Sequence, residues 1–456
     1  MENVLERTNA IVWGIPVLFL ILAVGILFSI QSRFAQIRLL PFALRRFLNS
    51  FKEQTPKAGI SGYKALCTAL AATVGTGNIA GVAGAIAIGG PGVVFWMWIC
   101  ALLGMVTKLA EVTLAIHYRT KDSKGEYIGG PMYLIRRGLP EKYHIFAFIY
   151  AFFGIVAAFG VGNATQVNAV VGGMKGIASI YGYEFGQVES IILGFILGIL
   201  IMAAFRGGAE GIGNWAEKLV PFASIVYIFL AIGVLCMCSS QIPNAVSAIV
   251  SGAFNPKSVT CGVVGSFFLT LRIGTSRGVF TNEAGMGTAS IAHAAAEVNH
   301  PVEQGLMGVL EVFLDTVVIC TLTALVILCS GIPIPYGSDP GINLTMDAFS
   351  VVYGDWCKVV ITALVCIFAF ATILGWGLYG IRCAQFLFGD NVWGRFILAQ
   401  VVAAILGVVL NTSVVWLFAE LVNGLMAIPN LIALFILSPE FICLLRQFID
   451  KEKRTA

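Results

Sequence analysis

Long apolar runs separated by short polar segments recur along the whole chain. We identify eleven runs that could each cross a hydrocarbon core of about 30 Å as a helix, at roughly 1.5 Å per residue. They predict transmembrane helices near residues 11–31, 66–88, 93–117, 145–172, 190–205, 218–239, 259–297 (interrupted), 304–330, 351–377, 395–411 and 414–437. No polar stretch between them is long enough to form another domain, so residues 1–456 are expected to form a single all-α, polytopic membrane domain.

Two of these runs contain glycine and polar residues where a continuous apolar helix is expected. The first reads Val74-Gly75-Thr76-Gly77-Asn78, and Ile273-Gly274-Thr275-Ser276-Arg277 repeats its order of residue types. An unpaired backbone group in hydrocarbon costs several kcal/mol, so an unwound segment is tolerated only where it lines a cavity. The sequence therefore predicts two broken helices that face an internal site.

The two predicted breaks occupy matching positions in the chain. Each lies in the first of five successive runs, within residues 66–239 and 259–437, and an odd number of crossings gives the two sets opposite orientation. Paired broken helices in inverted repeats are typical of secondary transporters. Residues 1–65 would add one helix and a cytoplasmic amphipathic connector, and residues 438–456 a cytoplasmic tail.

Broken helices also indicate what such a site could bind. A half-helix that begins at a break presents free N–H groups, which suit a carboxylate, and one that ends there presents free carbonyls, which suit an ammonium group or Na⁺. A zwitterionic amino acid matches both ends. The amide of Asn78 could add a donor and an acceptor.

Composition and charge agree with a membrane protein and suggest its orientation. The chain is 58% hydrophobic and 11% charged, whereas soluble domains carry roughly 25% charged residues. Lysine and arginine concentrate in the loops 33–64 and 119–142, which predicts that both loops are cytoplasmic. We therefore expect a plasma (inner) membrane protein with its N-terminus outside and its C-terminus inside. The net charge of +4 follows from this asymmetry and requires no nucleic-acid partner.

Ionisable residues inside apolar spans are costly and therefore candidates for function. Lys108 and Glu111 are three residues apart near a predicted cytoplasmic helix end, which favours a mutual surface pair. A second set lies deeper, and we expect an internal salt-bridge network in which an arginine pairs with a carboxylate and which shifts between open states. Its members are Arg272, Arg277, Glu283, Glu311 and Asp315. Proton coupling through one of these carboxylates is the alternative.

Three longer motifs make the sequence recognisable. The segments VGTGNIAGVAGAIAIGGPGVVFWMW, GGPMYLIRRGL and TNEAGMGTASIAHAAAE resemble those of the sodium:alanine (alanine or glycine:cation) symporter family, the AgcS-like carriers. The resemblance extends from about residue 10 to 445. It implies the leucine-transporter-type fold, two inverted five-helix repeats preceded by one extra helix, and Na⁺-coupled uptake of small neutral amino acids such as alanine or glycine.

The same resemblance implies site residues. Those expected to hold the substrate are Gly75, Thr76, Gly77, Asn78, Gln166, Ile273, Gly274, Thr372 and Trp376. Those expected near Na⁺ are Ala71, Val74, Ala369 and Thr372, so Thr372 is assigned to both sets. If Trp376 lines the pocket, its bulk would admit alanine and exclude leucine.

Several alternatives stay open from the sequence. The carrier could be coupled to H⁺ instead of Na⁺, or could prefer serine or glutamine. A passive channel is less favoured because channels usually repeat a pore around a symmetry axis. An enzyme is not expected, because no span offers a histidine with a partnering Ser, Cys or Asp, and we expect no cofactor and no metal other than Na⁺. The protein is expected to function as a monomer.

Overall fold

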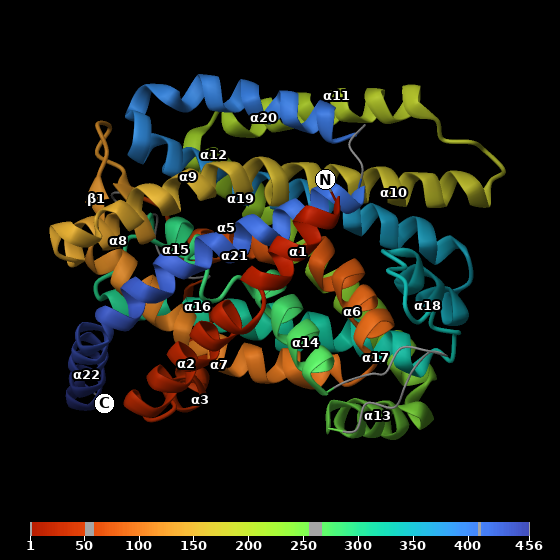
Figure 1. Cartoon of the computed structure of the whole chain (residues 1–456), viewed down its shortest axis with the longest axis horizontal. Coiled ribbons are helices and arrows are strands. Elements are labelled where there is room, and N and C mark those ends of the chain that lie inside the picture. Colours follow the sequence, from red (N-terminus) through yellow and green to blue (C-terminus); the bar gives the residue numbers. More distant parts are fainter. Residues whose placement is uncertain (1, 51–58, 255–266, 409–411, 456) are drawn as a thin grey trace.

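The computed structural model is a bundle of helices that run mostly along its long axis (Figure 1). The structure describes residues 2–50, 59–254, 267–408 and 412–455. Within these residues the strands are limited to a short antiparallel hairpin of β1 (Thr120–Lys121) and β2 (Tyr127–Ile128).

Eight helical stretches of the described residues are long and apolar enough to cross a membrane, or nine if one bent pair counts as a span. The bent pair is Gly62–Thr73 with Gly77–Gly89, and its two parts meet at 49°. The others are Arg7–Gln31, Val93–His117, Glu141–Ile180, Gln187–Phe205, Gly208–Met237, Pro301–Cys329, Trp356–Phe388 and Leu417–Ile436.

Individual helices make up these stretches. They are α1 (Glu2–Val12), α2 (Ile15–Gln31), α5 (Gly62–Thr73), η1 (Gly77–Gly81), α6 (Val82–Gly89), α7 (Val93–His117), η2 (Glu141–Tyr143), α9 (Ile145–Phe159), η3 (Gly160–Ala164), α10 (Thr165–Ile180), α11 (Gln187–Phe205), α12 (Gly208–Met237), α16 (Pro301–Val312), η5 (Phe313–Cys320), α17 (Thr321–Cys329), α19 (Trp356–Phe388) and α21 (Thr412–Ile436).

The remaining helices are shorter or lie at the ends of the bundle. They are α3 (Ala35–Arg38), α4 (Leu40–Ser50), α8 (Pro131–Gly138), η4 (Ser239–Gln241), α13 (Ile242–Phe254), α14 (Phe267–Asn282), α15 (Thr288–His293), α18 (Asn343–Tyr353), η6 (Asp390–Val392), α20 (Trp393–Gly407) and α22 (Ser438–Thr455).

Nine of the eleven predicted spans coincide with these long apolar stretches. The other two correspond to α14 with α15, and to α20. Part of each lies outside the described residues, namely 255–266 and 409–411, as does part of the predicted connector, 51–58. The count of eleven and the division into two five-helix repeats therefore stay predictions.

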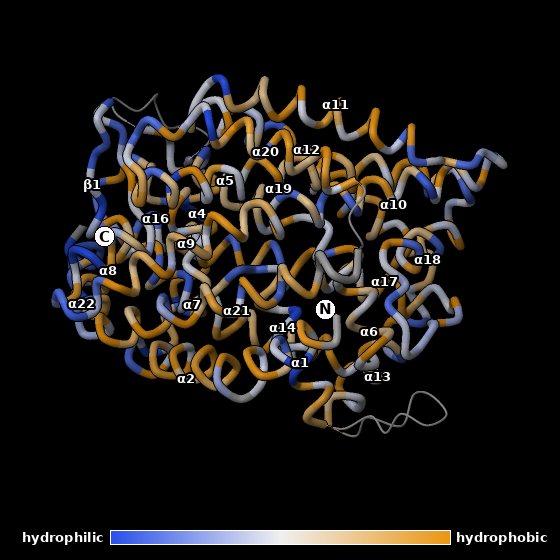
Figure 2. The backbone as a smooth tube through the Cα atoms, turned by 45° about the horizontal axis from the view of Figure 1, so that its top comes forward, coloured by the Kyte–Doolittle hydropathy of each residue, from blue (hydrophilic) through white to orange (hydrophobic). Residues whose placement is uncertain are grey.

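Hydrophilic residues gather at the two ends of the bundle (Figure 2). One end carries α8, α22 and the β1–β2 hairpin, and the other carries α18 and the loop between α10 and α11. The predicted cytoplasmic loop 119–142 and the C-terminal helix thus lie at the same end, as the charge pattern requires. Which end faces the cytoplasm stays a prediction.

The second broken helix differs from its prediction. Residues 273–277 are helical within α14, and the chain leaves the helix only after Asn282. Gly274 packs against α7, because a Cβ there would lie 2.5 Å from the Val93 carbonyl oxygen and 2.6 Å from Trp96 Cβ. Gly278 contacts Cys100 of α7 in the same way. These glycines permit close helix packing, and the break lies at residues 283–287.

Candidate functional site

The first break interrupts its span as the sequence predicts. α5 ends at Thr73, Val74 has an extended conformation, and the chain resumes as the π-helical segment η1. The Gly75 N–H donates to Asn78 Oδ1 at 2.8 Å, so the asparagine side chain pairs with a backbone donor inside the break. Asn78 is thereby committed to the backbone of the break and is not among the residues that line the adjoining cavity.

A small cavity lies beside this break. A water-sized sphere can occupy about 10 Å³ of it, roughly the room of one water molecule. Six residues that the sequence assigns to the substrate reach its wall through their side chains or backbone. The lining residues are Ala72, Thr73, Gly75, Thr76, Gly77, Val161, Gln166, Phe280, Glu283, Thr372 and Trp376.

Three polar side chains meet at the cavity. Thr76 Oγ1 donates to Gln166 Oε1 at 3.1 Å, which joins the first break to the start of α10. The Thr372 hydroxyl from α19 is buried and has no hydrogen-bond partner among the described residues. A Cβ on Gly75 would lie only 2.7 Å from Thr372 Oγ1, so only glycine lets the break approach this hydroxyl. Buried hydroxyls are nearly always paired, and Thr372 is therefore a candidate ligand for a bound group.

The residues expected near Na⁺ lie at the C-terminal end of α5 and in α19, and of them Thr372 lines the cavity. Ala71, Val74, Ala369 and Thr372 are all buried. Ala71 and Val74 belong to the C-terminal end of α5, where backbone carbonyls lack helical partners. Carbonyl and hydroxyl oxygens are the ligands that hard cations prefer. The donor set present here therefore suits Na⁺.

Ile273 and Gly274 do not reach the cavity, which corrects their assignment to it. Gly274 packs on α7, and Ile273 lies in a separate pocket with Arg272 and Arg277. Phe280 and Glu283, about two to three helical turns further along the same segment, occupy the expected place at the cavity wall. The shift follows from the later position of the second break.

The second break contains Glu283, whose φ of 56° is rare for a residue with a side chain. Gly285 and Gly287 also have positive φ, at 91° and 77°. Strained backbone of this kind persists where the surroundings hold it in place and is concentrated at functional sites. Glu283 Oε2 accepts a hydrogen bond from Thr288 Oγ1 at 2.5 Å, which fixes the carboxylate at the start of α15.

Glu111 holds the second break from α7. Its Oε1 accepts the N–H groups of Gly285 and Gly287 at 2.9 and 3.0 Å, and also the Asn430 amide at 2.7 Å. Glu111 is 1% exposed and Lys108 is 0% exposed, so the predicted surface pair of these two residues is wrong. Glu111 serves the backbone of the break, and Lys108 pairs elsewhere.

Asp315 connects the two breaks. Its Oδ1 accepts the Asn78 amide at 2.6 Å, and its Oδ2 accepts the Thr316 hydroxyl at 2.7 Å. Thr316 Oγ1 accepts in turn from the Asn282 amide at 3.1 Å. Asn78 belongs to the first break and Asn282 ends α14 at the second. A shift of either broken helix would therefore change the hydrogen bonds of this carboxyl group.

Glu311 anchors a second buried network. Its Oε1 lies 3.2 Å from Lys108 Nζ, and its Oε2 lies 3.0 Å from His293 Nε2. The Gln304 amide donates to His293 Nδ1 at 2.8 Å and to the Gly62 carbonyl at 3.0 Å. Because Nδ1 accepts, the histidine proton lies on Nε2 and is donated to Glu311.

The ion pairs therefore differ from the expected network. Arg277 pairs with Glu420 at 3.3 Å, and Arg272 lines a pocket near α1 and α21. Neither arginine pairs with Glu283, Glu311 or Asp315 in the described part of the chain. The cation that faces the deep carboxylates is Lys108. Arg272 and Arg277 both line the pocket near α1 and α21, which none of the deep carboxylates reaches.

Backbone hydrogen bonds join Ile60, just before α5, to the segment after α15. The Ile60 N–H donates to the Ala295 carbonyl at 3.1 Å, and the Glu297 N–H donates to the Ile60 carbonyl at 3.0 Å. Gln304 adds its bond to Gly62. The beginning of α5 and the segment after α15 are thus tied together.

Three π-helical segments gather around the site. η1 contains Asn78, η3 directly precedes Thr165 and Gln166, and η5 contains Asp315. Single-turn π segments within α-helices are frequent at functional sites. Glycines mark η1 and η3 in the sequence, but η5 (FLDTVVIC) carries no local signal.

Comparisons with known proteins agree with this geometry. The sequence pattern of the sodium:alanine symporter family matches residues 1–456. The sodium/alanine symporter AgcS of Methanococcus maripaludis is 40% identical over 458 residues, which cover 100% of this chain and 98% of that protein. The putative sodium/proton-dependent alanine carrier protein YrbD of Bacillus subtilis is 33% identical, over 100% of this chain and 94% of its own.

A solved structure supports the fold independently. MhsT, determined in complex with L-phenylalanine, superposes with a TM-score of 0.59 over 86% of this chain and 99% of its own, at 14% identity. The structural neighbours are transporters with the leucine-transporter fold, which confirms that part of the predicted architecture. The expectation of a transporter rather than an enzyme is likewise confirmed by the family match. On the strength of the full-length match and the 40% identity, the chain belongs to the sodium:alanine symporter family.

Proposed function

We propose that this protein is a secondary active symporter that takes up small neutral amino acids, such as alanine or glycine, with Na⁺ as the coupling ion. The observation that carries the proposal is the buried, unpartnered hydroxyl of Thr372, held against the unwound backbone at Gly75. The name of the relative AgcS, a sodium/alanine symporter, supports both the ion and the substrate.

The cavity suits a small zwitterion. Gly75, Thr76 and Gly77 bring backbone groups to its wall, and these groups can bind a carboxylate or an ammonium group without selecting a side chain. Trp376, Phe280 and Val161 supply the apolar part of the wall. The cavity has the room of about one water molecule, so the wall must move to admit even a small amino acid. Substrate selection would thus rest on size.

Alternating access completes the proposed mechanism. We infer a membrane domain of eleven spans that contains two inverted five-helix repeats. The broken helices 66–88 and 259–297 are the first helices of these repeats. The protein would lie in the plasma (inner) membrane, N-terminus outside and C-terminus inside, and would function as a monomer. Asp315 would transmit movement between the broken helices, because it bonds to Asn78 directly and to Asn282 through Thr316. Glu311 would link α15 to α7 through His293 and Lys108.

Coupling to H⁺ is a second candidate that one observation favours. Four buried carboxyl groups and one buried lysine lie around the two breaks: Glu111, Glu283, Glu311, Asp315 and Lys108. Buried carboxylates in excess of cations require a bound cation or a proton. Glu283 lines the cavity itself and could supply the proton site. The relative YrbD is named as a sodium/proton-dependent carrier.

Uptake of radiolabelled alanine into proteoliposomes tests the proposal. An inward Na⁺ gradient is expected to drive accumulation above the external concentration, and unlabelled glycine is expected to inhibit it. K⁺ in place of Na⁺ is the control. Accumulation driven only by an inward proton gradient would transfer the coupling to H⁺, and absence of accumulation under both gradients would reject symport.

Shortening Trp376 is expected to enlarge the range of substrates. The side chain is 1% exposed and closes the cavity, so Trp376→Leu opens space for a longer substrate side chain. We expect leucine to inhibit alanine uptake in the variant and not in the parent protein. Trp356→Leu is the matched control, because Trp356 begins the same helix and is 57% exposed. Unchanged selectivity in Trp376→Leu would contradict the role of this ring.

A further inference from the structure

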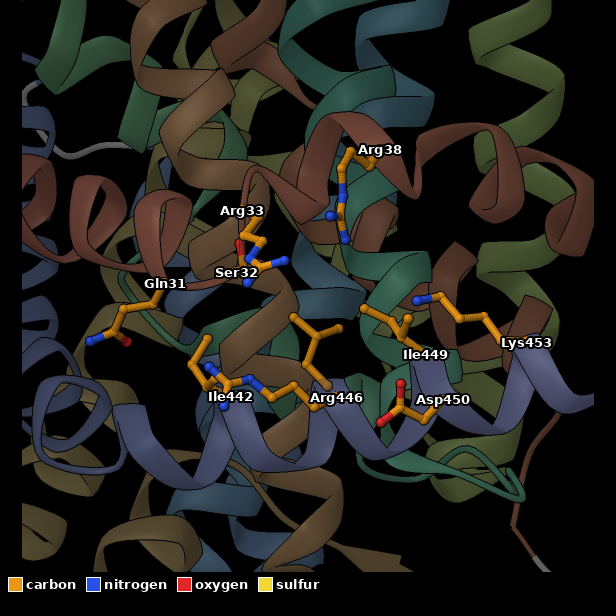
Figure 3. Close-up of a pocket in the computed structure, with 10 residues that line it drawn as sticks. Gln31, Ser32, Arg33, Arg38, Ile442, Arg446, Ile449, Asp450 and Lys453 are labelled. Carbon is orange, nitrogen blue, oxygen red and sulfur yellow. The ribbon is translucent and has the colours of Figure 1, made fainter.

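A second, larger pocket lies far from the substrate cavity, between the end of α2 and the C-terminal helix α22 (Figure 3). Its volume is about 350 Å³. It is formed by the end of α2, the turn that follows, the end of α3 and one face of α22. The lining residues are Gln31, Ser32, Arg33, Arg38, Ile442, Leu445, Arg446, Ile449, Asp450 and Lys453.

The pocket is strongly basic. Four of its residues carry positive charge and one carries negative charge: Arg33, Arg38, Arg446 and Lys453, with Asp450. In the described residues none of these four cations forms an ion pair within 4.0 Å. Arg33 extends from the turn, Arg38 from the end of α3 and Lys453 from α22 toward the space between these segments (Figure 3). The uncompensated charge indicates an anionic occupant.

The turn that presents Arg33 is held by specific contacts. Arg33 and Phe34 have φ values of 56° and 55°, both in the left-handed region that side chains rarely adopt. The Phe34 N–H donates to the Ser29 carbonyl at 2.7 Å, and the Ala35 N–H donates to Ser32 Oγ at 3.2 Å. Gln36 is fully buried and donates to Ser29 Oγ. The arginine is thus positioned by the fold.

Its place in the molecule puts this pocket at a membrane surface. The apolar span Arg7–Gln31 ends at the first lining residue. Beyond it, the turn, α3 and α4 expose large apolar side chains, including Phe34 at 49%, Ile37 at 53% and Leu48 at 62%. Such residues are typical of a segment that lies in the interface, with its apolar face toward the acyl chains. The pocket itself combines these cations with Ile442, Leu445 and Ile449.

We propose that this pocket binds the phosphate-bearing head group of an anionic phospholipid. The cations contact the phosphate, and the apolar residues of α22 contact the glycerol and upper acyl carbons. Basic pockets at the ends of membrane helices are suited to such head groups, and arginine pairs with phosphate through two hydrogen bonds. A lipid with two phosphates uses more of the four cations than one with a single phosphate. The bound lipid joins α22 to the turn after α2.

Native mass spectrometry of the purified full-length protein tests the proposal. The protein is reconstituted in vesicles of phosphatidylcholine alone, or with added phosphatidylglycerol or cardiolipin, and is then released for measurement. We expect retention of one anionic lipid and no retention of phosphatidylcholine, with cardiolipin held more tightly than phosphatidylglycerol. Equal retention of phosphatidylcholine and anionic lipids would overturn the proposal.

Charge-matched variants locate the site. Removing two cations from the pocket in R33Q/R446Q is expected to weaken anionic lipid binding about 10- to 30-fold, since each basic residue near a lipid surface contributes about a factor of five. R45Q/R454Q removes the same charge from exposed positions of α4 and α22 outside the pocket and is expected to bind normally. If both double variants bind anionic lipid equally weakly, the effect is one of overall surface charge, and the proposal that the pocket binds the lipid is overturned.

Two further arms keep the outcome decisive. If R33Q/R446Q does not fold, R33K/R446K retains the charge, loses the bidentate geometry and is expected to bind with intermediate affinity; binding equal to wild type or abolished would contradict guanidinium recognition. Inorganic phosphate is added as a competitor and is expected to leave the lipid bound, because it makes none of the apolar contacts. Displacement by inorganic phosphate at millimolar concentration would assign the pocket to a free anion.

Discussion

The Gly75→Ala variant is expected to fold and to lose alanine uptake by about 100-fold. The added methyl group would lie 2.7 Å from Thr372 Oγ1, a distance that real Cβ atoms do not tolerate, so the break or the threonine must move. A displacement of about 1 Å at a binding site can reduce its activity by two orders of magnitude. The measurement is the initial rate of Na⁺-driven uptake in proteoliposomes, normalised to the amount of monodisperse protein.

Gly81→Ala is the matched control for this variant. Gly81 ends the π segment of the same broken helix, and nothing lies within 4 Å of a Cβ built there. It should therefore retain uptake. The double variant Gly75→Ala/Thr372→Ala removes the clash together with the hydroxyl, and is expected to remain inactive because the hydroxyl is a ligand. Normal uptake by Gly75→Ala alone would remove the first break from the site.

The Lys108→Met variant is expected to lower the free energy of unfolding by about 3 to 5 kcal/mol relative to the parent protein. We expect this loss to be the largest for a single substitution in the interior. Lys108 and Glu311 are both 0% exposed, and the substitution leaves the glutamate charge without its cation. Charge removal on one side of a buried pair is far more damaging than removal of both charges. The readout is the midpoint of thermal unfolding in detergent, followed by the reactivity of the buried cysteines with a thiol dye.

A double variant separates this effect from a simple loss of packing. Lys108→Met/Glu311→Gln removes both charges, and the glutamine oxygen still accepts from His293 Nε2. It is expected to recover most of the lost stability without recovering transport. A Lys108→Met midpoint equal to that of the parent protein would mean that Glu311 is not a charged partner of this lysine.

The first break is the part of the site that the sequence predicts best. Its signal is local, because Gly75, Gly77 and Asn78 stand together within an apolar run and act on their own backbone. The number and placement of most spans are also local properties, set by apolar length. The cavity residues Gln166, Thr372 and Trp376 came from likeness to a family and lie together in the structure.

The second break was misplaced for a physical reason. Gly274 has the same local sequence pattern as Gly75. Gly274 lets α14 pack closely against α7, whereas Gly75 lets the unwound backbone of the first break approach Thr372 of α19. Which of these two roles a glycine has depends on the helix that packs against it, and the local sequence does not contain that information. The true break begins at Glu283, a residue type that does not favour positive φ, so no local preference marks it.

The partners of the buried charges could not be predicted for a different reason. Lys108 and Glu311 are 203 positions apart, and Glu111 and Asn430 are 319 apart. Spacing within a helix favoured Lys108 with Glu111, and expected depth in the membrane favoured Arg272 or Arg277 with the deep carboxylates. Helix rotation about the long axis decides which face each side chain occupies, and this rotation is a property of the assembled bundle.

The hydrogen bonds at the beginning of α5 restrict how the transporter can open there. Gln304 bonds to Gly62 at the beginning of α5 and to His293 near the end of α15, while Ile60 pairs with the chain beyond α15. While these hydrogen bonds hold, α5 cannot move independently of α15. Either α5 and α15 turn as one rigid arm about the two breaks, or the hydrogen bonds of Ile60 and Gln304 must rupture before the arm separates. In the second case the lifetime of these few bonds, rather than the occupancy of the cavity, sets the pace of opening.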